Sequence, residues 1–214
     1  MNRQTLPRTR PPRFFYFDLG NVLVTFSVQR MLDQVSALTG VPGGRLRHVF
    51  FDRGLQQDYE TGRVDRQEFY ERFCAMAGTR PEIDALRLAA SDIFELNVPV
   101  VPVLTSLALA RRPLGILSNT CEAHWEFCRG RYRLLDDLFM HRVLSFEVGA
   151  MKPDARIFEH AVELAGCRPE EIFYTDDLPA HIEGARAVGI DAVQYTTAGA
   201  LAEQLRRRGV GLQM

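Results

Sequence analysis

The segment that decides the fold is Phe14–Asn21, which reads Phe-Phe-Tyr-Phe-Asp-Leu-Gly-Asn. Its first part, Phe14–Leu19, is an aromatic and apolar run that is too short for a helix, and this predicts a strand buried on both faces, as in a parallel sheet. Gly20 and Asn21 then indicate a sharp turn. Asp18 is therefore expected near the carboxyl end of a buried strand, where open parallel sheets bind their ligands.

Beyond Pro99, short apolar runs alternate with helical patterns. We predict strands at residues 114–117, 143–146, 172–175 and 192–195. We predict helices at residues 100–111, around Trp125, and at 155–165, 182–188 and 200–208. This alternation is typical of an α/β protein with a doubly wound, Rossmann-like parallel sheet.

The segment between the first two predicted strands has helical patterns only. Ser27 can cap a helix that Gly40 ends, and the pair Asp65 and Glu68 has the spacing of a capping box. We see no strand-like alternation in this block, and we interpret it as an inserted all-helical cap. The predicted divisions are a basic arm at 1–13, an α/β core at 14–26 and 98–214, and a helical cap at 27–97.

Composition excludes several classes of protein. The 214 residues carry a formal net charge of −1 and are 46% hydrophobic, which argues against a disordered chain and against the strongly basic surface of a nucleic-acid-binding protein. No apolar stretch reaches the ~18 residues of a membrane span, and we see no signal-peptide pattern. The four cysteines form no CxxC pair, so we expect free thiols and a cytoplasmic protein. We expect no nucleic-acid or membrane partner, and the oligomeric state is open.

Polar residues follow each of the predicted strands that surround the expected ligand site. They are Asp18, Ser118, Asn119, Lys152, Asp176 and Asp177. Each has an ordinary structural explanation, as a turn former, a helix cap or a solvated charge, but together they favour a functional site. Lys152 is also the single lysine among 26 basic residues. An ammonium differs physically from a guanidinium because it is a compact point charge on a flexible stem.

The chemistry of these groups indicates phosphoryl transfer. Three carboxylates at one site repel one another unless a cation joins them, and hard oxygen ligands suit Mg²⁺. A lysine and a serine hydroxyl beside such an ion can bind phosphoryl oxygens, and a carboxylate can act as the nucleophile through an aspartyl-phosphate intermediate. We therefore expect an enzyme that acts on a small phosphorylated metabolite.

Four ordered motifs resemble the haloacid dehalogenase-like hydrolase superfamily. The motifs are FFYFDLGNVL at 14–23, ILSNT at 116–120, MKPD at 151–154 and FYTDDLPAHIEGA at 173–185. They look closest to bacterial glucose-1-phosphate phosphatases and to the N-terminal phosphatase domain of epoxide hydrolases. The resemblance implies a Mg²⁺-dependent phosphatase whose substrate is a phosphate monoester, with a sugar phosphate as one candidate.

The resemblance also implies a role for each motif residue. Asp18 would be the nucleophile and a metal ligand, with the main-chain oxygen of Gly20 and the carboxylate of Asp177 as further ligands. Asp176 would support the metal shell through water. Ser118 and Asn119 would bind the phosphoryl oxygens, and Lys152 would neutralise both the nucleophile and the phosphate.

Two residues depart from the family pattern. Gly20 stands where an aspartate usually protonates the leaving oxygen, and His181 stands where an acid or asparagine is common. His124 is one candidate to replace the missing acid, and an ordinary surface histidine is the alternative reading. Which cap residues face the substrate is open, with Gln57, Asp58, Tyr59 and Arg63 as candidates.

Other functions stay open at this point. A non-catalytic relative that binds a phosphorylated ligand or a partner is favoured by Gly20 and His181. A 2-haloacid dehalogenase needs no metal, and the acidic pair Asp176 and Asp177 counts against it. A receiver-type phosphorelay domain also combines Asp, Ser/Thr, Lys and an acidic pair, but its acidic pair belongs near the start of the chain, and no helical insert is expected.

Overall fold

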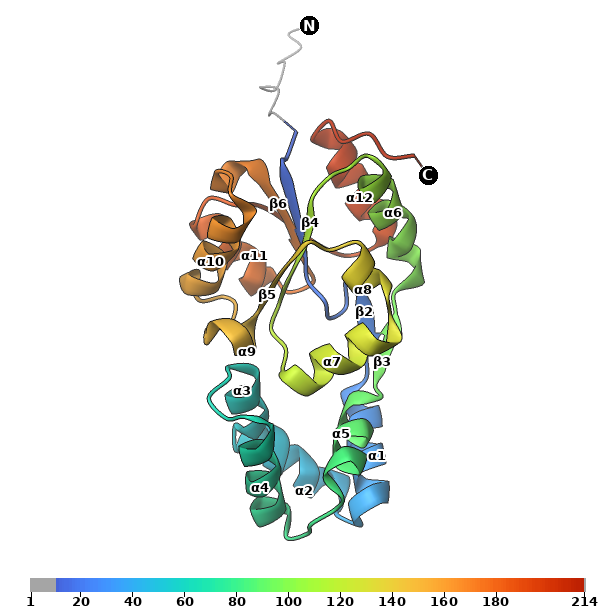
Figure 1. The fold of residues 1–214 in the computed structure, drawn as a ribbon, viewed down its shortest axis with the longest axis vertical. Helices are drawn as coiled ribbons and strands as arrows, with labels where there is room; N and C mark the ends of the chain where they lie inside the picture. Colours follow the sequence, from blue (N-terminus) through green and yellow to red (C-terminus); the bar gives the residue numbers. More distant parts are fainter. Residues whose placement is uncertain (1–10, 214) are drawn as a thin grey trace, which may run out of the picture.

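A computed structural model describes residues 11–213, so most of the predicted basic arm at 1–13 lies outside the described residues. Figure 1 shows an α/β core with the helical insertion at one end of it. No helix in the described part of the chain is long and apolar enough to cross a membrane. The four cysteines are free thiols, as predicted.

The centre of the core is a five-stranded parallel sheet with the order β5-β4-β1-β6-β7. The strands are β1 (Phe14–Phe17), β4 (Leu114–Ser118), β5 (His141–Leu144), β6 (Ile172–Asp176) and β7 (Asp191–Gln194). The first strand lies in the middle, and the chain adds strands first on one side of it and then on the other. The predicted doubly wound fold is therefore confirmed.

Helices cover both faces of this sheet (Figure 1). One layer contains α6 (Val101–Leu109), α7 (Glu122–Arg131), α8 (Leu134–Asp137) and α12 (Ala198–Arg207), and the other contains α9 (Ser145–Val148), α10 (Ala155–Ala165) and α11 (Pro179–Ala187). Short 3-10 turns η2 (Val98–Val100) and η3 (Pro169–Glu171) precede α6 and β6.

The aromatic side chains of β1 divide between the two layers. Phe15 and Phe17 belong to the larger buried cluster, whereas Phe14 and Tyr16 belong to the cluster under α10 and α11. Successive side chains of a strand point to opposite faces. A strand covered on both faces is thus apolar at every position, which is why its sequence is a continuous run.

The insertion between β1 and β4 is mostly helical. It contains α1 (Val28–Thr39), α2 (Gly43–Arg47), the π-helix η1 (His48–Asp52), α3 (Leu55–Glu60), α4 (Arg66–Ala77) and α5 (Ile83–Ser91). The hydroxyl of Ser27 caps α1 by accepting from the N–H of Arg30, and α1 ends at the left-handed Gly40. Asp65 caps α4 in the same way, as the sequence predicts.

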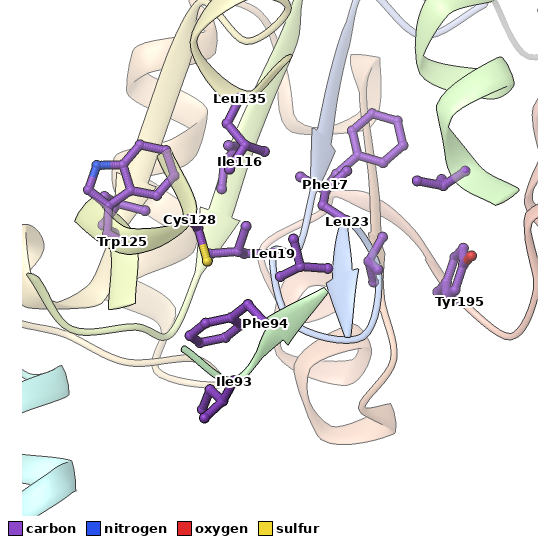
Figure 2. Close-up of a cluster of buried hydrophobic side chains, with 14 of the residues drawn as sticks. Phe17, Leu19, Leu23, Ile93, Phe94, Ile116, Trp125, Cys128, Leu135 and Tyr195 are labelled. Carbon is purple, nitrogen blue, oxygen red and sulfur yellow. The ribbon is translucent and has the colours of Figure 1, made fainter. Parts of the chain in front are cut away.

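Two short strands at the base of the insertion were not predicted. β2 (Val24–Phe26) pairs antiparallel with β3 (Phe94–Leu96), so the expectation of no strand within residues 27–97 was wrong. Each strand has only three residues, too few for a visible alternation. Figure 2 shows the apolar side chains that join this ribbon to the sheet, among them Phe17, Leu23 and Phe94.

The edge strand β5 also differs from its prediction. It covers His141–Leu144, two residues earlier than the predicted strand at 143–146, and the chain enters α9 at Ser145. The apolar run continues into α9, so hydrophobicity alone did not reveal where the strand ends. The shift matters because it brings Ser145 beside the site described below.

The cap and the core touch closely at Gly62, in the turn between α3 and α4. Gly62 has a φ of 67°, and a Cβ added there would lie 2.3 Å from the carbonyl oxygen of Phe146 in α9. Only a glycine permits both this left-handed backbone and this approach. The contact holds the end of α3 against the core.

Candidate active site

The predicted site residues Asp18, Ser118 and Asp176 lie at the carboxyl ends of three adjacent strands. Asp18 follows β1, and its N–H donates to the carbonyl oxygen of Thr175 at 3.0 Å. Ser118 ends β4 and Asp176 ends β6, the two strands that flank β1. Parallel pairing thus brings together residues that are far apart in the sequence.

Lys152 connects two of these carboxylates. Its Nζ lies 2.9 Å from Asp18 Oδ1 and 2.6 Å from Asp176 Oδ2, and it donates to the carbonyl oxygen of Leu117 and the hydroxyl of Tyr174, each at 3.0 Å. The side chain is fully buried. A buried ammonium is stable only when a negative charge lies beside it and its N–H groups donate hydrogen bonds. Lys152 has both.

Asp176 has contacts that the sequence analysis did not anticipate. Besides Lys152, it accepts from the Tyr174 hydroxyl and from the N–H of Leu178, and the Nδ1 of His181 lies 3.0 Å from each of its carboxylate oxygens. Asp176 is completely buried. It therefore holds the lysine and the start of α11 together, and His181 supports it directly.

Asn119 also contacts the lysine segment. Its side-chain amide donates to the carbonyl oxygen of Lys152 at 2.9 Å, and its Oδ1 accepts from the Lys152 N–H at 2.8 Å. The side chain of Asn119 thus positions Lys152, a role that the sequence analysis did not assign to it. Ser118 is buried beside Asp18.

A third carboxylate lies on the other side of Asp18. Carboxylate oxygens of Asp18, Asp176 and Asp177 lie within 4.8 Å of one another. Asp177 is more exposed than the other two and accepts a hydrogen bond from Asn21 Nδ2 at 2.9 Å. The three carboxylates offer a metal ion oxygen ligands. Their negative charge exceeds the single positive charge of Lys152, which among them contacts only Asp18 and Asp176. This combination fits a hard divalent cation.

Burial and charge act differently on the two carboxylates that contact Lys152. Burial raises the pKa of Asp18 to about 6, and Lys152 opposes this rise. Burial would also raise the pKa of Asp176, but Lys152 and His181 outweigh it and hold that pKa well below its usual range. Asp176 is therefore the permanently charged partner of the lysine, whereas charge on Asp18 is costly in the absence of a further cation.

A cavity of about 100 Å³ opens in front of these strand ends, between the core and the cap. Its core side includes Gly20, Ser118 and Asn119. The other walls are largely apolar and contain Met31, Phe26, Phe51 and Phe94, with three polar side chains among them, Gln56, Glu60 and His124. None of the described residues that line it is Lys or Arg.

The cap residues that line this cavity are not the ones singled out from sequence. Gln57 is exposed, and Asp58 forms ion pairs with Arg63 and Arg72 on the surface of the cap. Tyr59 lines a neighbouring cavity instead. The lining residues Gln56 and Glu60 are four positions apart, on one side of α3. That spacing was visible in the sequence, but nothing in the sequence distinguished this face of α3 from the others.

His124 is unsuited to donate a proton here. Its Nε2 lies 3.2 Å from the carbonyl oxygen of Ala90, and burial lowers the pKa of the imidazole to about 4, although this hydrogen bond opposes the shift. At neutral pH the ring is uncharged, and its Nε2–H is directed at Ala90.

The shifted pKa of His124 predicts a pH-dependent stability. Between pH 6.5 and 4 the unfolded chain binds a proton at His124 that the folded chain excludes, so the contribution of His124 to the free energy of unfolding should fall as the pH is lowered through this window, whereas the contribution of Asp18, whose pKa is raised to about 6, should rise. The loss should be at most about 3 kcal/mol. Urea unfolding at several pH values checks this. As the pH is lowered, the free energy of unfolding should therefore rise in His124→Gln relative to wild type, whereas His48→Gln, at an exposed position, should keep the wild-type slope. Equal slopes for wild type and His124→Gln would contradict the assignment.

Comparison with known proteins agrees with the fold. Residues 13–189 match the family model described as haloacid dehalogenase-like hydrolase. The chain therefore belongs to this family of hydrolases, as its motifs predict. The nearer subgroup, that of glucose-1-phosphate phosphatases, stays a prediction.

Individual relatives are distant in sequence but similar in length and fold. The chain is 24% identical over 196 residues to Phosphatase MT3486 of Mycobacterium tuberculosis, covering 86% of this chain and 87% of the relative. A predicted HAD-like family hydrolase from Porphyromonas gingivalis superposes with a TM-score of 0.80 at 24% identity, covering 91% and 98% of the two chains. A HAD family enzyme from Bacteroides thetaiotaomicron, solved with magnesium and inorganic phosphate, superposes with a TM-score of 0.77 at 24% identity. The match covers 87% of this chain and 95% of that enzyme.

Proposed function

We propose that this protein is a Mg²⁺-dependent phosphatase that hydrolyses a small phosphate monoester through a phosphorylated Asp18. The observation that carries the proposal is the contact of Lys152 with Asp18, inside a cluster of three carboxylates, next to residues that line the cavity between core and cap. A metal-independent dehalogenase has no evident use for this third carboxylate. The magnesium and phosphate bound by the Bacteroides thetaiotaomicron relative are consistent with the proposal.

The residues divide the chemistry between them. Asp18 attacks phosphorus with one carboxylate oxygen, and the ester oxygen leaves with its bonding electrons. Lys152 and the hydroxyl of Ser118 stabilise charge on the phosphoryl oxygens, and water then releases phosphate from Asp18. Asp18, the main-chain oxygen of Gly20 and Asp177 would hold Mg²⁺, which supplies further positive charge against the phosphoryl group.

The cavity suggests what kind of alcohol carries the phosphate. Its walls are apolar, and no described lining residue is cationic. A second phosphate or carboxylate on the substrate would be desolvated there without a partner. We therefore propose a monoester of a small, uncharged and largely apolar alcohol.

A phosphate-release screen tests the proposed function. Small alkyl and aryl phosphates should be hydrolysed in the presence of Mg²⁺ and not in excess EDTA, and bisphosphates should be poor substrates. Sugar phosphates belong in the same panel, since the sequence motifs suggest them. No release from any monoester at any Mg²⁺ concentration would overturn the proposal in favour of a non-catalytic binding protein.

Asp177→Asn is expected to weaken Mg²⁺ binding at least ~10-fold, because one anionic ligand is lost from the cluster. Titration calorimetry with Mg²⁺ alone measures this directly. Asp176→Asn should affect Mg²⁺ affinity less and lower the melting temperature instead, since Asp176 is the buried partner of Lys152 and His181. Asp137→Asn, on the exposed side of α8, is the matched control. Equal loss of Mg²⁺ affinity in the Asp176 and Asp177 variants would contradict the assignment.

A further inference from the structure

An alkoxide is a poor leaving group, so cleavage of an alkyl phosphate is accelerated when an acid protonates the departing oxygen. The turn that follows β1 offers no acid to protonate the leaving oxygen, because residue 20 is glycine. A Cβ at position 20 would lie 3.1 Å from the ring of Phe26, so this aromatic side chain takes up space beside Gly20. Lys152 is already bound to two carboxylates, a hydroxyl and a carbonyl oxygen.

Glu60 is the one carboxyl side chain among the described residues that line the cavity. It is the last residue of α3 and lines the same cavity as Gly20 and Ser118. We infer that Glu60 is the general acid of this active site, which supplies the leaving oxygen with its proton from the cap side of the substrate. This inference rests on the proposed phosphatase function.

The main chain of Glu60 is attached to the phosphoryl-binding segment. The hydroxyl of Ser145 donates to the carbonyl oxygen of Glu60 at 2.6 Å, and the same hydroxyl accepts from the N–H of Thr120 at 3.0 Å. Thr120 is two residues after Ser118. With the close contact at Gly62, these bonds hold the end of α3 against the core. Glu60 therefore has a defined position relative to the predicted phosphate, although it belongs to the cap.

The surroundings of Glu60 favour the protonated form of its carboxyl group. Its carboxylate accepts a hydrogen bond from Gln56 Nε2 at 2.9 Å, and no lining residue within the described part of the chain offers a positive charge. Burial raises the pKa of Glu60, and the bond from Gln56 only partly opposes this. The other ionisable groups nearby are the thiol of Cys121, which burial keeps protonated, and the neutral His124.

The proton balance closes over one catalytic cycle. As the bond from Asp18 to phosphorus forms and the ester P–O bond breaks, the Glu60 proton passes to the leaving oxygen and gives the neutral alcohol. The Glu60 carboxylate then takes a proton from the water that attacks phosphorus. Cleavage of the Asp18–phosphorus bond releases phosphate and restores both side chains.

The dependence of rate on the leaving group tests this role. Glu60→Gln keeps the size of the side chain and an oxygen that can accept from Gln56, but it has no proton to transfer at neutral pH. We expect kcat/KM for an alkyl phosphate to fall at least ~10²-fold. For 4-nitrophenyl phosphate, whose leaving group needs no proton, we expect a change of less than about threefold. The ratio kcat/KM is the proper measure because it excludes the later attack by water.

Three outcomes are informative. A steeper dependence of kcat/KM on leaving-group pKa in Glu60→Gln than in wild type supports the inference. Glu159→Gln, at an exposed position of α10, should leave this dependence unchanged. An equal loss on both substrates, or no loss, overturns the role of Glu60 while the phosphatase stands. If the wild-type protein releases phosphate from neither substrate, the proposed phosphatase function itself is wrong.

Discussion

Asp18→Asn should reduce phosphate release at least ~10³-fold, because an amide cannot form the phosphorylated intermediate and offers Mg²⁺ no full negative charge. The fold should persist. The Asp18 carboxylate is buried, and its pKa is raised to about 6, so the charged group is disfavoured in the folded protein without metal. An uncharged side chain of the same size removes that cost. The melting temperature in EDTA is therefore expected to rise.

Phosphate release at saturating Mg²⁺ and thermal unfolding in EDTA measure the two effects separately. Asp33→Asn, on α1 of the cap, is the matched control, because Asp33 contacts Gln29 far from the site. Substantial activity in Asp18→Asn would show that the aspartyl-phosphate mechanism is wrong. Loss of activity together with loss of folding would leave the mechanism to be tested with Asp18→Ser.

Lys152→Arg should lower kcat at least ~10²-fold although the charge is retained. The ammonium is fully buried within 3.0 Å of four oxygen atoms, from Asp18, Asp176, Leu117 and Tyr174. A guanidinium is broader and planar, and it directs its donors in a fixed fork. It cannot occupy this space without displacing Asp18 or Asp176. The proposed contact of Lys152 with the phosphoryl group should be strongest in the transition state, so its loss should lower mainly kcat.

The control for Lys152→Arg is the reverse exchange at an exposed position. Arg206→Lys, on α12, should change the free energy of unfolding by less than ~0.5 kcal/mol and leave kcat unaltered. Near-normal kcat in Lys152→Arg would mean that the single lysine of the chain reflects amino-acid usage rather than chemistry. Lys152→Met is expected to lower the free energy of unfolding by about 3–5 kcal/mol relative to wild type, because Asp176 would then be buried without its ion-pair partner.

The site residues could be predicted because each of them follows a local sequence pattern. An apolar run followed by a turn marks the end of a buried strand, and parallel strands present these ends at one edge of the sheet. Asp18, Ser118 and Asp176 could therefore be grouped from the sequence. The role of Asp18 as the nucleophile stays a prediction that the Asp18→Asn variant tests, and the role of Ser118 as a phosphate ligand also stays a prediction; the contact of Asp176 with Lys152 was not predicted.

The parts that the sequence did not reveal depend on contacts between distant segments. The strands β2 and β3 are too short for a periodic pattern, and β5 ends where α9 begins without a change in hydrophobicity. The pairing of Lys152 with Asp176 requires β6 to lie beside β1. None of these features has a signal within a window of ten residues.

By itself, the sequence determined the parallel α/β core, the helical insertion and the identity of the reactive groups, because strand burial, helix capping and turn formation are properties of neighbouring residues. Only the tertiary structure decided which face of α3 meets those groups. Gln56 and Glu60 reach the cavity because Ser145 and Gly62 hold the end of α3 against the core. Such contacts join segments that are about 85 positions apart, and their geometry is set by the packing of the whole chain.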